Sequence, residues 1–71
     1  MKNYNNIEFV TFCIEIYGGA KDISGREAYE KLNSTGALDY IDECYEGLHV
    51  ETNDGIVWNI DEFINNNQVT V

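Results

Sequence analysis

The sequence predicts a small, mainly helical α+β domain: three helices in a helix-turn-helix-like core, a β-hairpin and a short C-terminal helix. Three observations indicate this fold class. Apolar residues recur at helical spacing in several segments. Ser24 and Glu27 have the spacing of a helix-start signal, and Asp54-Gly55 lies between two short β-prone runs. With 71 residues, the chain is expected to form a single domain over residues 1–71.

The first predicted helix covers residues 6–17. Its few polar residues, Glu8 and Glu15 among them, share one narrow stripe, and apolar side chains occupy most of the remaining surface. We expect such a helix to be covered on several sides and to lie at the centre of the domain. The Gly18-Gly19 pair is expected to end it, because glycine adopts the left-handed backbone that often closes a helix.

A capping box is expected to start the second helix at Ser24. The Ser24 hydroxyl would accept a hydrogen bond from the Glu27 amide, and the Glu27 side chain would reach back to the Ser24 amide. Tyr29 and Leu32 are expected to face inward, and Gly36 is expected to separate the second helix from the third.

The third predicted helix covers residues 37–46, with Gly47 as its C-terminal cap. Its apolar residues recur at helical spacing, and acidic residues occupy the opposite face. These acids are Asp39, Asp42, Glu43 and Glu46.

A β-hairpin is predicted next. The β-prone runs 49–52 and 56–58 flank Asn53-Asp54-Gly55, a typical turn sequence. The last predicted helix begins near Asn59, with acids in its first turn. Residues 68–71 are expected to form either a frayed tail or a short edge strand.

The charge balance narrows the range of partners. Thirteen acidic residues against four basic ones give a formal net charge of −9. Nucleic-acid binding is disfavoured, because phosphate contacts require Lys and Arg. No apolar run approaches the roughly 18 residues of a membrane span and no signal-peptide pattern is found, so we expect a cytoplasmic protein that does not bind membranes. No Lys or Arg follows Lys31, so the C-terminal half is purely acidic.

Chemistry-bearing residues are few. His49 is the single histidine, and the spacing of the serines places none of them beside it as a nucleophile. Cys13 and Cys44 lack the spacing of a zinc site. We therefore expect no enzyme activity, no metal and no cofactor.

The acidic face of the third helix is the strongest candidate functional surface. Like charges three and four residues apart mildly destabilise a helix, and no basic residue lies beside them in the sequence. We interpret this face as a docking surface for a basic protein partner, with an exposed aromatic anchor. A solvated face without a binding role is the competing interpretation. The predicted partner-binding residues are Asp39, Tyr40, Asp42, Glu43, Glu46 and His49.

Two other functions remain open. A small domain with a thin core is often completed by a dimer interface, so a self-assembling homodimeric module is one alternative. The order of elements also resembles the winged-helix arrangement, which makes a DNA-binding regulator the other alternative. Acids on the third helix would repel phosphates in that role.

Five segments of the chain carry a family resemblance. They are Phe9-x-x-Phe12-Cys13-Ile14-Glu15-x-Tyr17, Ile23-Ser24-Gly25-x-Glu27, Gly36-x-Leu38-Asp39-Tyr40-Ile41, Tyr45-x-x-Leu48-His49 and Ile60-Asp61-Glu62-Phe63-Ile64. Together they resemble a family of small acidic bacterial proteins known only as a domain of unknown function. The resemblance implies a compact helical fold in the bacterial cytoplasm and no catalytic residue. Such proteins are often encoded beside toxin-like proteins that resemble ADP-ribosyltransferases, which implies an antitoxin or accessory role toward the product of a neighbouring gene.

Overall fold

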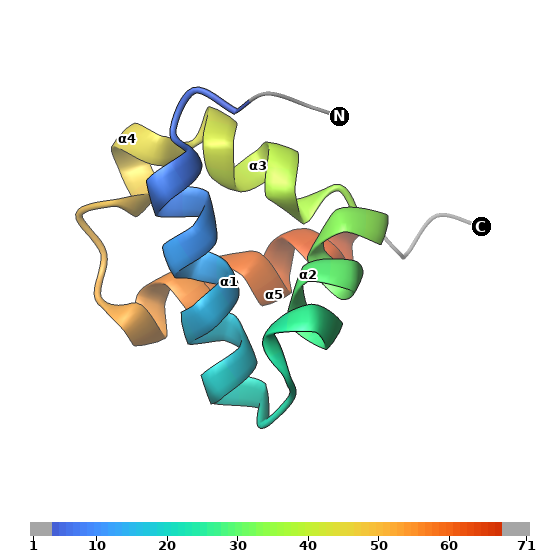
Figure 1. The fold of residues 1–71 in the computed structure, drawn as a ribbon. Helices are drawn as coiled ribbons and strands as arrows, with labels where there is room; N and C mark the ends of the chain where they lie inside the picture. Colours follow the sequence, from blue (N-terminus) through green and yellow to red (C-terminus); the bar gives the residue numbers. More distant parts are fainter. Residues whose placement is uncertain (1–3, 68–71) are drawn as a thin grey trace.

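The computed structural model describes residues 4–67, and every regular element in that range is an α-helix (Figure 1). The mainly helical character is as predicted. The described residues contain no strand, so the predicted β-hairpin, and with it the α+β fold class, is wrong. The alternatives for residues 68–71 lie outside the described range. The helices are α1 (Ile7–Lys21), α2 (Gly25–Ser34), α3 (Ala37–Glu43), α4 (Tyr45–Leu48) and α5 (Asn53–Asn67).

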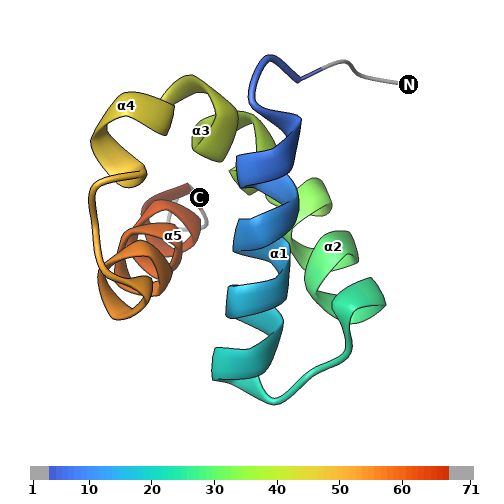
Figure 2. The same cartoon turned by 60° about the vertical axis from the view of Figure 1, so that its left-hand side comes forward.

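Helix α1 occupies the centre of the molecule, as the sequence predicts. It packs against α2, α3 and α5. Figure 2 shows α2 and α5 flanking α1, with α3 and α4 across one end. The residues that α1 buries, Val10, Cys13 and Tyr17 among them, recur at helical spacing along its length.

Side chains from all five helices form one core. Among residues 4–67, no helix combines the length and the apolar character that crossing a bilayer requires. The core residues are almost completely buried apolar side chains: Val10, Cys13, Tyr17, Ala28, Leu32, Ala37, Leu38, Ile41, Leu48, Ile56, Ile60 and Ile64.

Helix α1 ends later than predicted. Gly18 and Gly19 lie inside the helix, and Asp22 closes it in the left-handed conformation, with φ of 58°. A Cβ atom on Gly18 would lie 3.2 Å from the carbonyl oxygen of Ile23 and 3.4 Å from the Cβ of Ala28. The absence of a side chain at Gly18 therefore allows α2 to approach α1 closely.

The capping box of α2 is confirmed. Ser24 Oγ accepts a hydrogen bond from the Glu27 amide at 3.0 Å, and Glu27 Oε1 accepts one from the Ser24 amide at 3.0 Å. Leu32 is buried as predicted, whereas Tyr29 is exposed, so the prediction that Tyr29 faces inward is wrong. Gly36 interrupts the helical conformation between α2 and α3 as predicted, with φ of 82°.

The third predicted helix is divided in two. Helix α3 ends at Glu43 and α4 begins at Tyr45, because Cys44 leaves the helical conformation with φ of −101° and ψ of 23°. Gly47 lies inside α4, so the prediction that it caps the helix is wrong. As a result, Glu46 belongs to a different helix from the acids that precede it.

Residues 53–58 of the predicted hairpin and the predicted last helix together form α5, and residues 49–52 connect α4 to α5. The Thr52 hydroxyl accepts a hydrogen bond from the Gly55 amide at 3.1 Å, and the Thr52 carbonyl accepts one from Ile56 at 2.9 Å. These are the bonds of a helix start. Ile56, Ile60 and Ile64 recur every four residues and are buried. This helical period outweighs the Asp-Gly turn signal.

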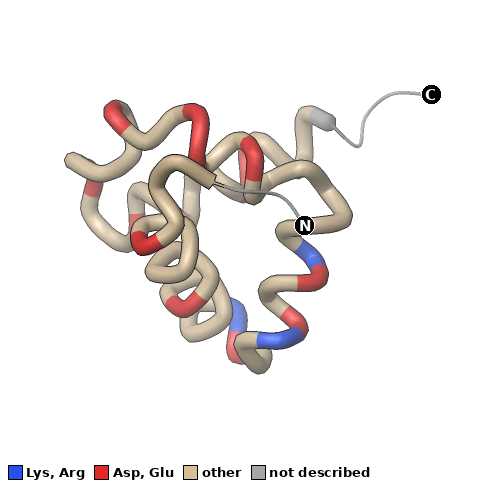
Figure 3. The backbone as a smooth tube through the Cα atoms, turned by 45° about the horizontal axis from the view of Figure 1, so that its top comes forward, with Lys and Arg blue, Asp and Glu red and all other residues tan. Residues whose placement is uncertain are grey.

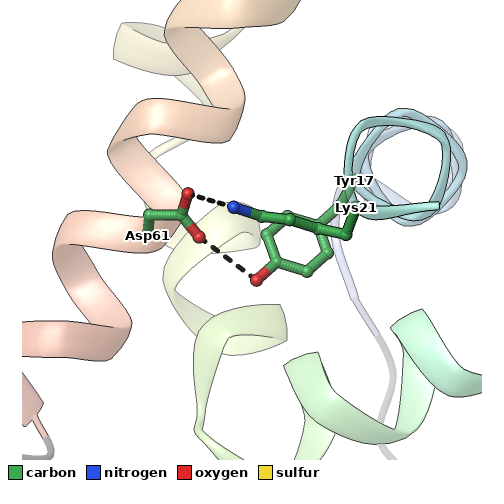
Figure 4. Close-up of polar contacts among 3 residues, drawn as sticks. All are labelled: Tyr17, Lys21 and Asp61. Atoms are coloured by element: carbon green, nitrogen blue, oxygen red, sulfur yellow. Dashed lines mark hydrogen bonds and ion pairs between the residues drawn. The ribbon is translucent and has the colours of Figure 1, made fainter. Parts of the chain in front are cut away.

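A polar contact joins α1 to α5 (Figure 4). Asp61 forms an ion pair with Lys21 Nζ at 2.6 Å and accepts a hydrogen bond from the Tyr17 hydroxyl at 3.2 Å. Burial of the Tyr17 ring, followed by the negative charge of Asp61, raises the pKa of the Tyr17 phenol. The hydrogen bond to Asp61 is the main cause that raises the pKa of the Lys21 ammonium.

We expect this contact to weaken at alkaline pH. Both groups have a higher pKa in the folded chain than their ordinary values of 10.0 and 10.5, so their stabilising contribution is fully present below about pH 10 and is lost as the pH rises through the raised values. Replacing Tyr17 by Phe should lower the free energy of unfolding by about 1 kcal/mol at neutral pH and make its alkaline decline shallower. Urea unfolding across a pH series measures both effects, with Tyr29→Phe as the exposed-tyrosine control. An equally steep decline in Tyr17→Phe would contradict the expectation.

Candidate functional site

Three of the predicted partner-binding residues lie together where α3 meets α4. Asp42 and Glu43 end α3, Glu46 lies in α4, and all three line a hollow of about 680 Å³. These three acids are termed the acidic corner. Glu43 and Glu46 are exposed, and within residues 4–67 neither forms an ion pair. The interruption of the helix at Cys44 places the three acids around the junction of α3 and α4.

The other three predicted residues lie elsewhere. Asp39 lines a separate hollow beside Tyr29. Tyr40 is half-buried, and its ring stacks on Phe63 of α5 with 4.5 Å between ring centroids, so it packs onto the fold and does not project as an exposed anchor. His49 is exposed and lines a groove next to the acidic corner. The structure therefore brings three of the six predicted residues together and places the other three outside the acidic corner.

Asp42 is the member of the acidic corner that the fold itself uses. Its carboxylate accepts hydrogen bonds from the backbone amides of Asn5 at 3.2 Å and Asn6 at 2.7 Å. The Asn6 side chain in turn donates to the Asp42 carbonyl at 3.2 Å. A carboxylate at this position satisfies amides at the start of α1 and faces the positive end of the helix dipole. Glu43 and Glu46 are the exposed acids of the acidic corner.

The described basic residues lie away from the acidic corner. Lys21 ends α1, and Arg26 and Lys31 belong to α2. Figure 3 shows these residues in blue around the α1–α2 turn and along α2, while acids in red mark the α3–α4 end without a blue neighbour. The acidic corner therefore has a negative field that no nearby cation of the described chain cancels.

An aromatic groove, which the sequence did not predict, adjoins the acidic corner. It has a volume of about 470 Å³. Two large apolar side chains of α1 that line the groove are exposed to solvent: Ile7 is 55% exposed and Phe12 is 42% exposed. Tyr45 lines both the groove and the hollow of the acidic corner, so the two features are continuous. The term aromatic groove refers to five of its lining residues: Ile7, Phe9, Phe12, Tyr45 and His49.

Contacts between the rings hold the aromatic groove in shape. The rings of Phe9 and Tyr45 form an edge-to-face contact, with ring centroids 5.2 Å apart and ring planes at 83°. Tyr45 and His49 stack at 4.5 Å with planes at 8°, and His49 Nδ1–H donates to the Tyr45 carbonyl oxygen at 2.8 Å. Such contacts order the rings within the free chain, which lowers the entropy cost of binding.

Comparison with known proteins assigns the chain to a family. A family model described as a protein of unknown function (DUF3791) matches residues 8–67. The chain belongs to this family. The resemblance to a domain of unknown function is thereby confirmed, and the DUF3791 match spans the acidic corner and all of the aromatic groove except Ile7. No curated protein and no solved structure matches the chain.

The two cysteines of this DUF3791 member have different environments. Burial raises the pKa of the Cys13 thiol to about 12, whereas Cys44 is exposed and lines the hollow of the acidic corner. Alkylation requires an accessible thiolate. Among residues 4–67, no group of three or more His, Cys, Asp or Glu side chains is placed to hold a metal ion.

We expect iodoacetamide to modify Cys44 in the folded protein and to leave Cys13 unmodified. Mass spectrometry after a brief exposure measures the extent of reaction at each thiol. In urea both thiols should react, which provides the control for reagent access. Comparable native rates at Cys13 and Cys44 would contradict the buried placement of Cys13.

Proposed function

We propose that the protein is a non-catalytic interaction domain that binds a basic segment of a protein partner at the acidic corner. The observation that carries the proposal is the exposure of Glu43 and Glu46 on a hollow with no cation beside them in the described chain. Lys or Arg residues of a partner would neutralise this field. Such complementarity mainly raises the association rate and selects partners.

The predicted binding residues have unequal parts in this proposal. Glu43 and Glu46 would contact the partner directly, and His49 would contact it at the edge of the acidic corner. Asp42 would act by holding the start of α1 against α3. Asp39 lies outside the proposed contact because it lines a different hollow.

The family resemblance supports the cellular setting that we propose. We place the protein in the bacterial cytoplasm, in an antitoxin-like or accessory role, with the product of a neighbouring gene as its partner. A toxin-like partner would be inhibited or stabilised by contact, and no catalytic group on this chain is needed for either effect.

Self-assembly as a homodimer is the second candidate function. The exposed indole of Trp58, 62% accessible on α5, favours it, because large exposed aromatic side chains are enriched in interfaces. Light scattering over a concentration series tests it, and a strict monomer at high concentration would remove it. The DNA-binding alternative depends on a wing, and the described residues contain no strand to form one.

Isothermal titration against the neighbouring gene product tests the proposed function. The variant Glu43→Lys with Glu46→Lys should weaken binding by at least about tenfold and reduce its salt dependence. The matched control is Glu15→Lys with Glu62→Lys, which makes the same change in net charge at exposed sites on α1 and α5. The control should bind like the wild type. Absence of binding by the wild type, or equal losses in both variants, would contradict the proposal.

A further inference from the structure

The partner's chemistry can be specified further from the aromatic groove. This inference rests on the proposed function, because it concerns the same partner at the adjoining surface. Tyr45 is common to the groove and to the hollow of the acidic corner, as are Asn5 and Asn6. A segment that lies across the acidic corner therefore reaches the groove without a break.

The two surfaces differ in what they can bind. The acidic corner presents the exposed carboxylates of Glu43 and Glu46, which attract cations. The aromatic groove presents Ile7 and Phe12 to solvent beside the half-buried rings of Phe9 and Tyr45. Burying an apolar side chain against these rings removes apolar surface of both partners from water, which favours binding.

The groove is also flanked by negative charge. Glu8 lines it on the side of α1 and is exposed, and Glu46 lies at the neighbouring hollow. Among residues 4–67, no Lys or Arg lines the groove. An apolar side chain that enters it is therefore best carried by a segment with basic residues on either side.

We infer that the aromatic groove receives an apolar side chain of the partner, and that the partner segment is amphipathic and basic, with an apolar anchor between Lys or Arg residues. A purely polybasic tail would leave Phe12 exposed. A second copy of this chain is disfavoured as the occupant, because a symmetric contact through this surface brings Glu8, Glu43 and Glu46 toward the same acids of the other copy.

The anchor enters a surface that needs little rearrangement. Tyr45 makes an edge contact with the ring of Phe9 and a stacking contact with the ring of His49. Anchor residues contribute most when they fill pockets of this kind, while the surrounding polar contacts exclude water and set orientation. In this arrangement the acids select a basic partner, and the groove holds it.

Three synthetic peptides of equal length test the inference by NMR titration of the full chain. One contains Leu and Lys in an amphipathic helical pattern, the second replaces every Leu by Ser, and the third replaces every Lys by Glu. The Leu/Lys peptide should shift the amide signals of groove residues 7–12 and 49 as well as those of the acidic corner at residues 42, 43 and 46. The Ser/Lys peptide should shift only the acidic corner and bind about tenfold more weakly.

Two variants connect these shifts to the groove. Phe12→Ala should reduce the affinity for the Leu/Lys peptide to about that of the Ser/Lys peptide and leave Ser/Lys binding unchanged. The matched control is Trp58→Ala, because Trp58 is an exposed aromatic residue that does not line the groove. This control should leave the binding of both peptides unchanged.

The outcomes distinguish the inference from the proposed function. Equal affinity for the Leu/Lys and Ser/Lys peptides, with shifts confined to the acidic corner, would overturn the inference and leave the proposed function standing. Failure of both Lys peptides to bind at low salt would overturn the proposed function as well. Equal binding of the Leu/Glu and Leu/Lys peptides would show that the groove binds apolar side chains without regard to charge, and would overturn the basic character of the segment. Groove signals that shift with protein concentration alone would show that a second copy of the chain occupies the groove.

Discussion

Replacing Ile56 by Ala is expected to lower the free energy of unfolding by about 2 to 4 kcal/mol. Ile56 is 2% exposed on α5 and faces the common core, so truncation removes buried apolar contacts and leaves a cavity. Urea unfolding followed by circular dichroism measures the change. In a domain of this size the effect is a large share of the total stability.

Trp58→Ala provides the contrast that makes this prediction specific to the helix. In a β-strand, Ile56 and Trp58 would point to the same face, because side chains alternate with a period of two. In α5 they point in different directions, and Trp58 is 62% exposed although it is the larger residue. We expect Trp58→Ala to cost less than about 1 kcal/mol. Similar losses for the two variants would contradict the helical assignment of residues 53–58.

Replacing Asp42 by Ala is expected to cost about 1 to 2 kcal/mol of stability. The substitution leaves the amides of Asn5 and Asn6 without their carboxylate acceptor and removes a favourable charge at the start of α1. Asp42→Asn keeps an acceptor oxygen and should retain part of the stability. Chemical denaturation measures the total loss, and amide hydrogen exchange in the first turn of α1 shows where it arises.

The control for Asp42 is its neighbour Glu43. Glu43 is exposed, and none of the described hydrogen bonds involves its side chain, so Glu43→Ala should change stability by less than about 0.5 kcal/mol. Equal losses in Asp42→Ala and Glu43→Ala would show that the acidic corner plays no part in capping α1. This contrast is also the reason that the charge-reversal variants leave Asp42 unchanged. A substitution at Asp42 would change the stability of the fold as well as the affinity for a partner.

Signals that span a few residues predicted much of the fold. The spacing of Ser24 and Glu27 is enough to form a capping box, and the helical recurrence of apolar residues places α1 at the centre. The error at residues 53–58 arose because Asp54-Gly55 suits both a hairpin turn and the first turn of a helix. The recurrence of Ile56, Ile60 and Ile64 is the longer-range signal that decides between them.

The candidate site was harder to predict because it depends on contacts between distant segments. The sequence identifies Glu43 and Glu46 as acids of one region, but it does not reveal that Asp42 bonds to residues 36 and 37 positions earlier. One feature of the sequence does indicate the exposure of a groove residue. Phe12 lies four residues after Glu8 and three before Glu15, and therefore on the side of the polar stripe that faces solvent.

Protection of Cys44 in the complex tests the central claim, that the acidic corner is the surface that contacts a partner. Cys44 lines the same hollow as Glu43 and Glu46 and is exposed in the free chain. At saturating neighbouring gene product, its alkylation by the uncharged reagent iodoacetamide should slow by about tenfold or more. A thiol introduced on α5 by Glu62→Cys should react at its free rate. An unchanged rate at Cys44 in a saturated complex, with slowing at the introduced thiol, would contradict the account.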